Sequence, residues 1–354
     1  MLQNHSLKSL KNFNPNKVPI SLYIHLPWCE KRCPYCDFNI NTNKLDGDEE
    51  RLLAALNQDL QDSMKYIQKR KFCSVYFGGG TPSLVSSKII KRIIKNLNDM
   101  GHLKEECEIS FELNPKEVSH SYLNEIIAAG VNRVSIGIQS FDQGVLDSLE
   151  RNHSTNDSYQ AIKIASEFKN INISIDLIYA VMNQSIASLK QDIEIFCKNK
   201  IDHLSLYQLT IEPNTIFYKK ELNIPSDKTI ESMELAAKDI LNRNNIFQYE
   251  VSSWAKDSKV SKHNMNYWLY GDYLGIGPGA HSKITAKNSI TRMIKLKKVE
   301  SYINNPSKIT KVKVNDSSYD LDLAMNLLRI KNGTSFEDLE KRGIYISDTF
   351  KEKL

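Results

Sequence analysis

Three cysteines crowd into one short segment of the chain, at Cys29, Cys33 and Cys36. They stand at positions i, i+4 and i+7, directly after an apolar stretch with strand character. A 4Fe–4S cluster usually takes four thiolates, so three thiolates from one loop leave one iron open. An open iron can chelate the amino and carboxylate groups of S-adenosylmethionine (SAM), and one electron then cleaves the sulfonium to give a 5′-deoxyadenosyl radical. The cofactor supplies that chemistry, and the protein orients it.

Zinc is the main alternative for this loop. Structural zinc takes four tetrahedral ligands, and only His25 stands close by as a fourth candidate. The other cysteines, Cys73, Cys107 and Cys197, each occur singly in an apolar stretch, where free cysteine usually acts as a small buried hydrophobe. The clustered cysteines are therefore predicted to be iron–sulfur ligands, and the single ones to be packing residues.

Short β-branched runs alternate with amphipathic helical patterns through the first part of the chain. Apolar residues at helical spacing after Asp48 and after Ser86 predict two of these helices. The predicted strands are Ser21–Pro27, Cys73–Phe77, Cys107–Leu113, Arg133–Gln139, Ile171–Tyr179 and His203–Thr210. This alternation requires parallel pairing with right-handed crossovers. We expect an α/β protein built as an open, partial (β/α)6 barrel.

The pattern changes after Glu212. A helix is predicted over Lys228–Arg243, followed by a stretch rich in Tyr, Trp and Gly from Gln248 to His281. A helix at Leu321–Ile330 and another from Ser335 predict a small helical or winged-helix-like module. The expected parts are a polar N-terminal tail at 1–20, the partial barrel at 21–245 and a C-terminal region at 246–354.

Polar residues follow several of the predicted strands. Functional groups of parallel α/β barrels gather at the carboxyl ends of the strands. Gly78–Pro82 follows the second strand, and its glycines allow close backbone approach to a ligand, although a tight turn explains them equally well. Glu112 and Gln139 end the next two strands, Asp176 lies in the fifth, and Arg151 follows the fourth unit. Asp176 is either a structural carboxylate or an acceptor for ribose hydroxyls. Together these residues predict a binding rim above the cysteine loop.

Composition excludes several classes of protein. The 354 residues are 41% hydrophobic and 25% charged, and the net charge of +5 is spread along the chain. A nucleic-acid-binding protein would carry a clustered basic stripe. No apolar run is long enough to cross a bilayer, and Met1–Lys17 lacks the apolar core of a secretory signal. We therefore expect a cytoplasmic protein whose thiols stay reduced.

These segments resemble the radical SAM superfamily, and within it the coproporphyrinogen dehydrogenase-like branch, with the best match to the HemW-type heme chaperones. The resemblance covers most of the chain. The segments that carry it are Tyr23–Cys29, Cys36–Asn39, Gly78–Ser83, Phe111–Pro115, Arg133–Phe141, Tyr207–Thr215, His263–Trp268 and Gly271–His281.

The resemblance implies roles for individual residues. Cys29, Cys33 and Cys36 would ligate the 4Fe–4S cluster, with SAM beside it. The implied SAM contacts are Tyr23 and Tyr35 flanking the site, Gly79, Gly80 and Thr81 at the methionine end, and Glu112, Gln139, Arg151 and Asp176 along the rest of the molecule, with Asp176 near the ribose. Heme would be the cargo, passed to an acceptor protein, and a flavodoxin- or ferredoxin-type protein would supply electrons. Heme needs an axial ligand, and the sequence does not choose among His25, His263 and His281.

The resemblance is compatible with two functions, a heme chaperone and a coproporphyrinogen III dehydrogenase, and one position favours the chaperone. Oxygen-independent coproporphyrinogen III dehydrogenases carry a further cysteine two residues after the third one, where this chain has Phe38, and a longer N-terminal segment. This favours a heme chaperone over the dehydrogenase, and it leaves open whether the chain is an enzyme. The branch usually has Gly-Leu-Pro-x-Gln after the fifth strand, whereas this chain has Ala180-Val-Met-Asn-Gln184, which changes the backbone options of that turn. The C-terminal module is also shorter than the family's usual one.

Overall fold

A computed structural model describes residues 13–199, 201–256, 258–314 and 316–353. Within these residues, twelve strands form one sheet in the order β12-β11-β10-β9-β1-β2-β3-β4-β5-β6-β8-β7. The strands are β1 Ile20–Leu26, β2 Phe72–Gly79, β3 Leu103–Leu113, β4 Arg133–Gln139, β5 Asn172–Tyr179, β6 His203–Gln208, β7 Phe247–Glu250, β8 Ser253–Ala255, β9 Asp272–Ile276, β10 His281–Ala286, β11 Ser289–Lys295 and β12 Ile309–Lys313.

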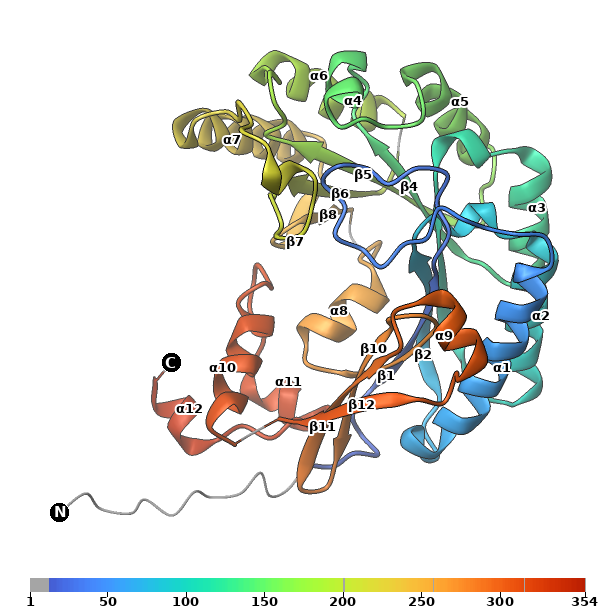
Figure 1. Cartoon of the computed structure of the whole chain (residues 1–354). Coiled ribbons are helices and arrows are strands. Elements are labelled where there is room, and N and C mark those ends of the chain that lie inside the picture. Colours follow the sequence, from blue (N-terminus) through green and yellow to red (C-terminus); the bar gives the residue numbers. More distant parts are fainter. Residues whose placement is uncertain (1–12, 200, 257, 315, 354) are drawn as a thin grey trace.

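Strands β1 to β6 pair in parallel and in sequence order, each with the next. The sheet curves around an open interior, and its edge strands, β7 and β12, do not pair with each other (Figure 1). The partial α/β barrel expected from the sequence is therefore confirmed. Its third strand begins at Leu103, earlier than predicted, because Leu103 pairs with Phe72 of β2. An irregularity follows, and the regular pairing with β2 resumes at Glu108.

Helices cover the convex outer face of this sheet (Figure 1). They are α1 Asp48–Ile67, α2 Ser87–Asp99, α3 His120–Ala129, α4 Gln143–Ser148, α5 Thr155–Ser166, α6 Ile186–Lys198 and α7 Asp227–Arg243. In α2 the isoleucines and leucine predicted to share one face are all buried, as an amphipathic helix requires. Helix α5 begins with a capping box, in which Ser154 and Asp157 each accept a hydrogen bond from the other's backbone N–H.

The C-terminal region adds strands that the sequence analysis did not anticipate. Strand β9 pairs in parallel with β1, and β10, β11 and β12 follow as antiparallel neighbours. At the other edge, β8 pairs antiparallel with β6. The remaining helices are α8 Lys262–Trp268, α9 Val299–Asn304, α10 Asp316–Leu327, α11 Phe336–Lys341 and α12 Asp348–Lys353. A glycine interrupts β9, and polar residues are mixed with apolar ones in the other short strands, which hides their alternation in the sequence.

A second core, separate from that of the barrel, lies under helices α10 to α12. Phe13 and Val18, from the segment expected to be a polar tail, are buried in it. Phe13 packs edge-on against Tyr319 and Tyr345, with ring centroids 5.6 and 6.0 Å apart. The N-terminal end of the described chain therefore helps to hold the C-terminal helices.

Two clusters of buried charge join the C-terminal strands to the barrel. In β9, Asp272 accepts hydrogen bonds from Arg70 (2.7 Å), Lys283 (3.0 Å) and both the backbone and the hydroxyl of Thr285 (2.9 and 2.7 Å). In the second cluster, Asp59 of α1 is bonded to Lys295 and Tyr302. No helix within the described residues is long and apolar enough to span a membrane.

Candidate functional site

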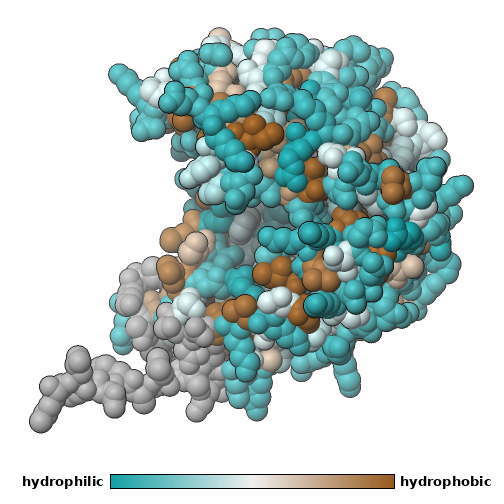
Figure 2. All heavy atoms as spheres, in the orientation of Figure 1, coloured by the Kyte–Doolittle hydropathy of each residue, from teal (hydrophilic) through white to brown (hydrophobic). Residues whose placement is uncertain are grey.

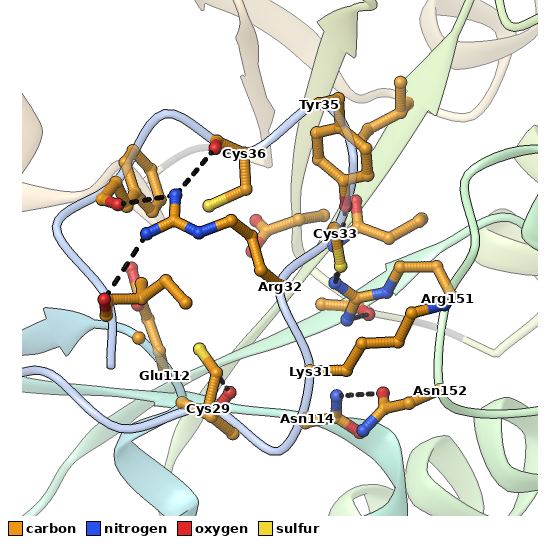
Figure 3. A pocket seen from close by; sticks show the side chains of 18 of the residues that line it. Cys29, Lys31, Arg32, Cys33, Tyr35, Cys36, Glu112, Asn114, Arg151 and Asn152 are labelled. Atoms are coloured by element: carbon orange, nitrogen blue, oxygen red, sulfur yellow. Dashed lines mark hydrogen bonds between the residues drawn. The ribbon is translucent and has the colours of Figure 1, made fainter. Parts of the chain in front are cut away.

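A cavity of about 390 Å³ opens at the carboxyl ends of the barrel strands. Three walls form it: the loop after β1, the glycine loop after β2, and residues at the ends of β3 to β6. Figure 3 shows the side chains of Cys29, Cys33 and Cys36 on this cavity together with Glu112 and Arg151. The cysteine loop and the strand-end residues predicted to form one rim do lie around one space.

The cysteine loop is held by its own backbone and by one arginine. Backbone bonds from Cys29 N to Asn41 O (3.0 Å) and from Asn41 N to Pro27 O (2.7 Å) close its base. The guanidinium of Arg32 donates to three carbonyls of the loop, those of Cys36 (3.3 Å), Phe38 (3.4 Å) and Ile40 (3.3 Å), as Figure 3 shows in part. Arg32 was not singled out from the sequence, because only the folded loop brings those carbonyls to it.

The end of the loop is tied to both the barrel and the C-terminal region. His25 of β1 bonds through Nε2 to the carbonyl of Asn39 (2.7 Å). The amide of Asn39 in turn donates to the carbonyls of Pro278 (2.9 Å) and Lys297 (2.8 Å). The cysteine loop is therefore positioned by contacts far apart in the sequence, which is how a site is held rigid on a scaffold.

The glycine loop lies directly against the base of the cysteine loop. A Cβ on Gly80 would stand 2.5 Å from the Trp28 carbonyl oxygen, and Gly79 has a φ of 120°. The next residue, Thr81, donates its N–H to Trp28 O (2.7 Å) and its hydroxyl to the sulfur of Cys29 (3.4 Å). Only glycine allows the two backbones to approach so closely. Packing alone therefore requires glycine at positions 79 and 80, whether or not a ligand binds there.

Two acidic residues face the cavity, and among the described residues neither has a cation at hydrogen-bonding distance. Glu112 accepts a bond from the Tyr76 hydroxyl (2.7 Å), and Asp176 accepts from Ser135 (3.0 Å). Burial, together with the nearby charge of Asp176, raises the pKa of Glu112 to about 7. Burial also raises the pKa of Asp176, although hydrogen bonds from Ser205 and Ser135 oppose the shift. A buried carboxylate with so few hydrogen-bond donors destabilises the fold when it is ionised, unless a ligand supplies further donors.

Arg151 is a cation on the cavity lining, together with Lys31 and Arg32, and it lies against the cysteine loop. Its Nη1 donates to the sulfur of Cys33 (3.4 Å) and to the hydroxyl of Tyr35 (3.3 Å), and its Nη2 donates to Gly137 O (3.4 Å). Its buried Nε has no partner in the described structure. A guanidinium of this kind can stabilise a thiolate and still offer a donor to an anionic group.

The cavity lining includes eleven of the twelve residues predicted to hold the cluster and SAM. These are Cys29, Cys33, Tyr35, Cys36, Gly79, Gly80, Thr81, Glu112, Gln139, Arg151 and Asp176. Tyr23 is not on the lining. It points its hydroxyl to His25 Nδ1 (3.0 Å) behind the glycine loop. Its ring also lies 3.1 Å from where a Cβ on Gly78 would stand.

Several lining residues were not predicted. They include Arg32, Phe38, Asn114, Ser135, Gly137, Tyr207, Leu209 and Thr210. Asn114 and Tyr207 fall in segments that carry the family resemblance, which could have flagged them. Ser135 could have been found from strand alternation, because it pairs across from Glu112 and Ser174 in register. Neighbouring strands thus line one face with polar side chains.

The donor set fits a cluster better than a single metal ion. Among the described residues, no three His, Cys, Asp or Glu side chains stand close enough to bind one ion. A four-iron cube takes each thiolate on a different iron and so spreads its ligands further apart. All three cysteines are free and half-buried. Burial raises the pKa of Cys29, and raises that of Cys36 to about 11, so these thiols need a metal to ionise.

The other cysteines and the histidines lie away from the cavity lining. Cys107 is buried as predicted, whereas Cys73 and Cys197 are only half-buried. His263 is buried in the barrel and bonded to Ser74 (2.9 Å), and burial lowers its pKa to about 3. His281 is exposed on β10.

Known proteins resemble this chain in sequence and in fold. Residues 23–196 match the model of the radical SAM superfamily. The heme chaperone HemW of Buchnera aphidicola is 36% identical over 95% of this chain and 89% of its own length. The heme chaperone HemW of Escherichia coli is 38% identical over 75% of this chain and 71% of its own length. The structure of coproporphyrinogen III oxidase (HemN) from E. coli, a radical SAM enzyme, superposes with a TM-score of 0.77 at 21% identity, over 97% of this chain and 82% of that one.

The matched domain, the open α/β barrel and the cysteine loop at its strand ends define a radical SAM protein. Within that superfamily the chain belongs to the HemW family. Its fold is also that of HemN, over nearly its whole described length.

Proposed function

We propose that this protein is a heme chaperone that retains a radical SAM site. The observation that carries the proposal is the 36% identity to a HemW heme chaperone over 95% of the chain. The geometry adds support, because the residues implied for the cluster and SAM surround one cavity. Heme is the proposed cargo, and a heme-accepting protein is the proposed recipient.

The residues of the cavity divide the work of binding. Cys29, Cys33 and Cys36 would hold the 4Fe–4S cluster, which when bound supplies one-electron reduction of SAM. Arg151 sits between Cys33 and the open cavity, where it balances negative charge on the sulfur. Asp176 stands deeper, as an acceptor for ribose hydroxyls, and the glycine loop gives SAM an approach to bare backbone. A flavodoxin- or ferredoxin-type protein is the proposed electron donor, and the cytoplasm the proposed location.

Coproporphyrinogen III dehydrogenase is the second candidate function, because the chain shares the fold of HemN. Phe38 weighs against it. This residue occupies the place of that enzyme's further cysteine and lines the cavity with 59% of its surface exposed. An apolar ring cannot do the chemistry of a thiol. We also propose the division into a barrel at 21–245 and a C-terminal region at 246–354.

Iron analysis tests the cluster. Protein reconstituted without oxygen should bind about four irons per chain, and the triple variant Cys29→Ser, Cys33→Ser, Cys36→Ser should lose nearly all of them. Cys107→Ala serves as the control and should keep the iron. Full iron content in the triple variant would refute the ligand assignment.

Parallel assays separate the two functions. The reconstituted protein should give a Soret band on adding heme and pass that heme to an apo-acceptor such as apomyoglobin. It should form no protoporphyrinogen from coproporphyrinogen III when supplied with SAM and a reductant. SAM-dependent turnover of coproporphyrinogen III would replace the chaperone proposal with the dehydrogenase.

A further inference from the structure

A second hollow, outside the barrel, lies between helix α7 and the strands β6 to β8. Its volume is about 520 Å³, within the range of small-molecule sites. One wall is α7, and the other includes Leu328 to Lys331, which follow α10. Figure 2 shows the surface deeply hollowed on the side where α7 and β7 face α10. We call this hollow the α7 groove.

The walls of the α7 groove are fixed. The N–H of Val251 donates to Arg329 O (2.9 Å), and the N–H of Lys331 donates to Tyr249 O (3.0 Å). Glu250 and Ile330 form a β-bridge between these two bonds. Backbone hydrogen bonds therefore hold the segment after α10 against β7, and they fix the backbone of that wall of the groove.

The lining of the groove is apolar on the floor and at the rim. Leu206, Ala237 and Trp254 are buried beneath it. Leu235, Val251 and Leu328 stand at its edge with 61, 55 and 78% of their surfaces exposed. Large apolar side chains gathered at the edge of a hollow mark a binding surface, whereas scattered ones do not.

The charge at the groove is mainly positive. Lys238, Arg329 and Lys331 line it together with one carboxylate, that of Glu234. Arg329 is already paired with the buried carboxylate of Glu250 (3.3 Å). Glu234 already accepts a hydrogen bond from the Tyr179 hydroxyl (2.6 Å). Lys238 and Lys331 are exposed and form no ion pair among the described residues. A ligand with an apolar body and two carboxylates would satisfy both the floor and the cations.

We propose that the α7 groove is the binding site for the heme cargo, an inference that rests on the proposed heme-chaperone function. Heme has a flat apolar macrocycle and two propionates along one edge. The apolar floor and rim match the macrocycle, and Lys238 and Lys331 match the two propionates. The strand-end cavity is a poorer match, because it is lined by Glu112 and Asp176 and is already assigned to the cluster and SAM.

The residues that line the groove determine which part of heme it would recognise. None of its lining residues is His, Cys or Met, the usual axial ligands of heme iron. Recognition therefore depends on the macrocycle and the propionates rather than on the metal. Iron-free protoporphyrin IX should bind within about threefold of heme. Either ligand should quench the fluorescence of Trp254 in the groove floor.

The experiment compares variants of the full-length, reconstituted protein by heme titration. The double variant Val251→Glu, Leu328→Glu should weaken heme binding at least tenfold, and so should Lys238→Glu, Lys331→Glu. These four side chains are exposed, so the fold should survive, and iron content and circular dichroism check this. The control Leu321→Glu, 65% exposed on α10 and outside the groove, should bind heme like the wild type.

Each outcome is decisive. If wild type and all groove variants bind heme equally, the α7 groove is not the site and the chaperone proposal stands. If wild type binds no heme, the proposed function itself fails. Loss of binding in both groove variants but not in Leu321→Glu supports the site.

Discussion

Buried carboxylates occur in two regions of this molecule, and their surroundings differ. Asp272 in β9, fully buried, receives hydrogen bonds from two cations and from both donors of Thr285. Glu112 in the cavity receives a side-chain bond only from the Tyr76 hydroxyl, with no cation among its described side-chain partners. The first arrangement is complete within the chain and joins two parts of the fold. The second is incomplete within the chain, which is how a ligand-binding site differs from a structural joint.

The largest loss of stability should come from breaking the buried ion pairs of Asp272. Asp272→Asn leaves Arg70 and Lys283 buried without their counter-ion, and loss of one partner of a buried pair costs about 3–5 kcal/mol. Urea denaturation should show this loss. Asp239→Asn breaks an exposed ion pair with Arg243 and should cost less than about 1 kcal/mol. Equal, small losses in the two variants would mean that the Asp272 cluster does not hold the joint.

Whereas Asp272 stabilises the fold, the ionised carboxylate of Glu112 should destabilise it. Its folded pKa of about 7 lies above its ordinary value of 4.5, so the folded state binds the proton more tightly than the unfolded state. Glu112 therefore destabilises the fold progressively as pH rises from 4.5 to 7, and its full cost, up to about 3 kcal/mol, is present above pH 7.

Glu112→Gln should remove that cost, because the amide keeps an oxygen to accept the Tyr76 bond. The variant of the cluster-free protein should be more stable than wild type at pH 8 and nearly equal to it at pH 5. Urea denaturation at both values measures this. A variant less stable than wild type at pH 8 would show that the charged carboxylate is satisfied within the chain after all.

Asp176 should affect ligand binding more than folding. Asp176→Asn should weaken SAM binding by roughly tenfold, about 1.4 kcal/mol, through loss of a charged acceptor. Iron content should stay normal, because Asp176 lies in β5 and not in the cysteine loop. Isothermal titration with SAM, with exposed Asp46→Asn as the control, tests this. Iron lost with SAM affinity unchanged would reverse the assignment.

The smallest effect should come from the turn after β5. Ala180, where the family usually has glycine, has a left-handed φ of 61°, which costs an alanine about 1 kcal/mol or more. Ala180→Gly relieves that strain but loses a buried methyl group and frees the unfolded chain. Stability should change by less than about 1 kcal/mol, and SAM affinity by less than about twofold. A tenfold change in affinity would show that this turn shapes the cavity.

The parallel part of the fold was predictable because its signals are local. Buried strands read as apolar runs, and Arg133–Gln139 was predicted with the bounds that the structure has. Ser174 and Asp176, two residues apart in β5, both line the barrel interior, as strand alternation requires. By contrast, β9 was missed because its parallel partner, β1, lies about 250 residues earlier and its own sequence is broken by glycine.

The sequence by itself determined the cysteine loop, the glycine loop and the order of the first six strands, because spacing and periodicity within a few residues encode them. Only the tertiary structure decided which side chains meet. Arg151 reaches Cys33 across 118 positions and Asp272 reaches Arg70 across 202. The α7 groove likewise needs α7, β8 and the segment after α10 to come together. Such contacts depend on strand pairing and chain closure, and no local pattern records them.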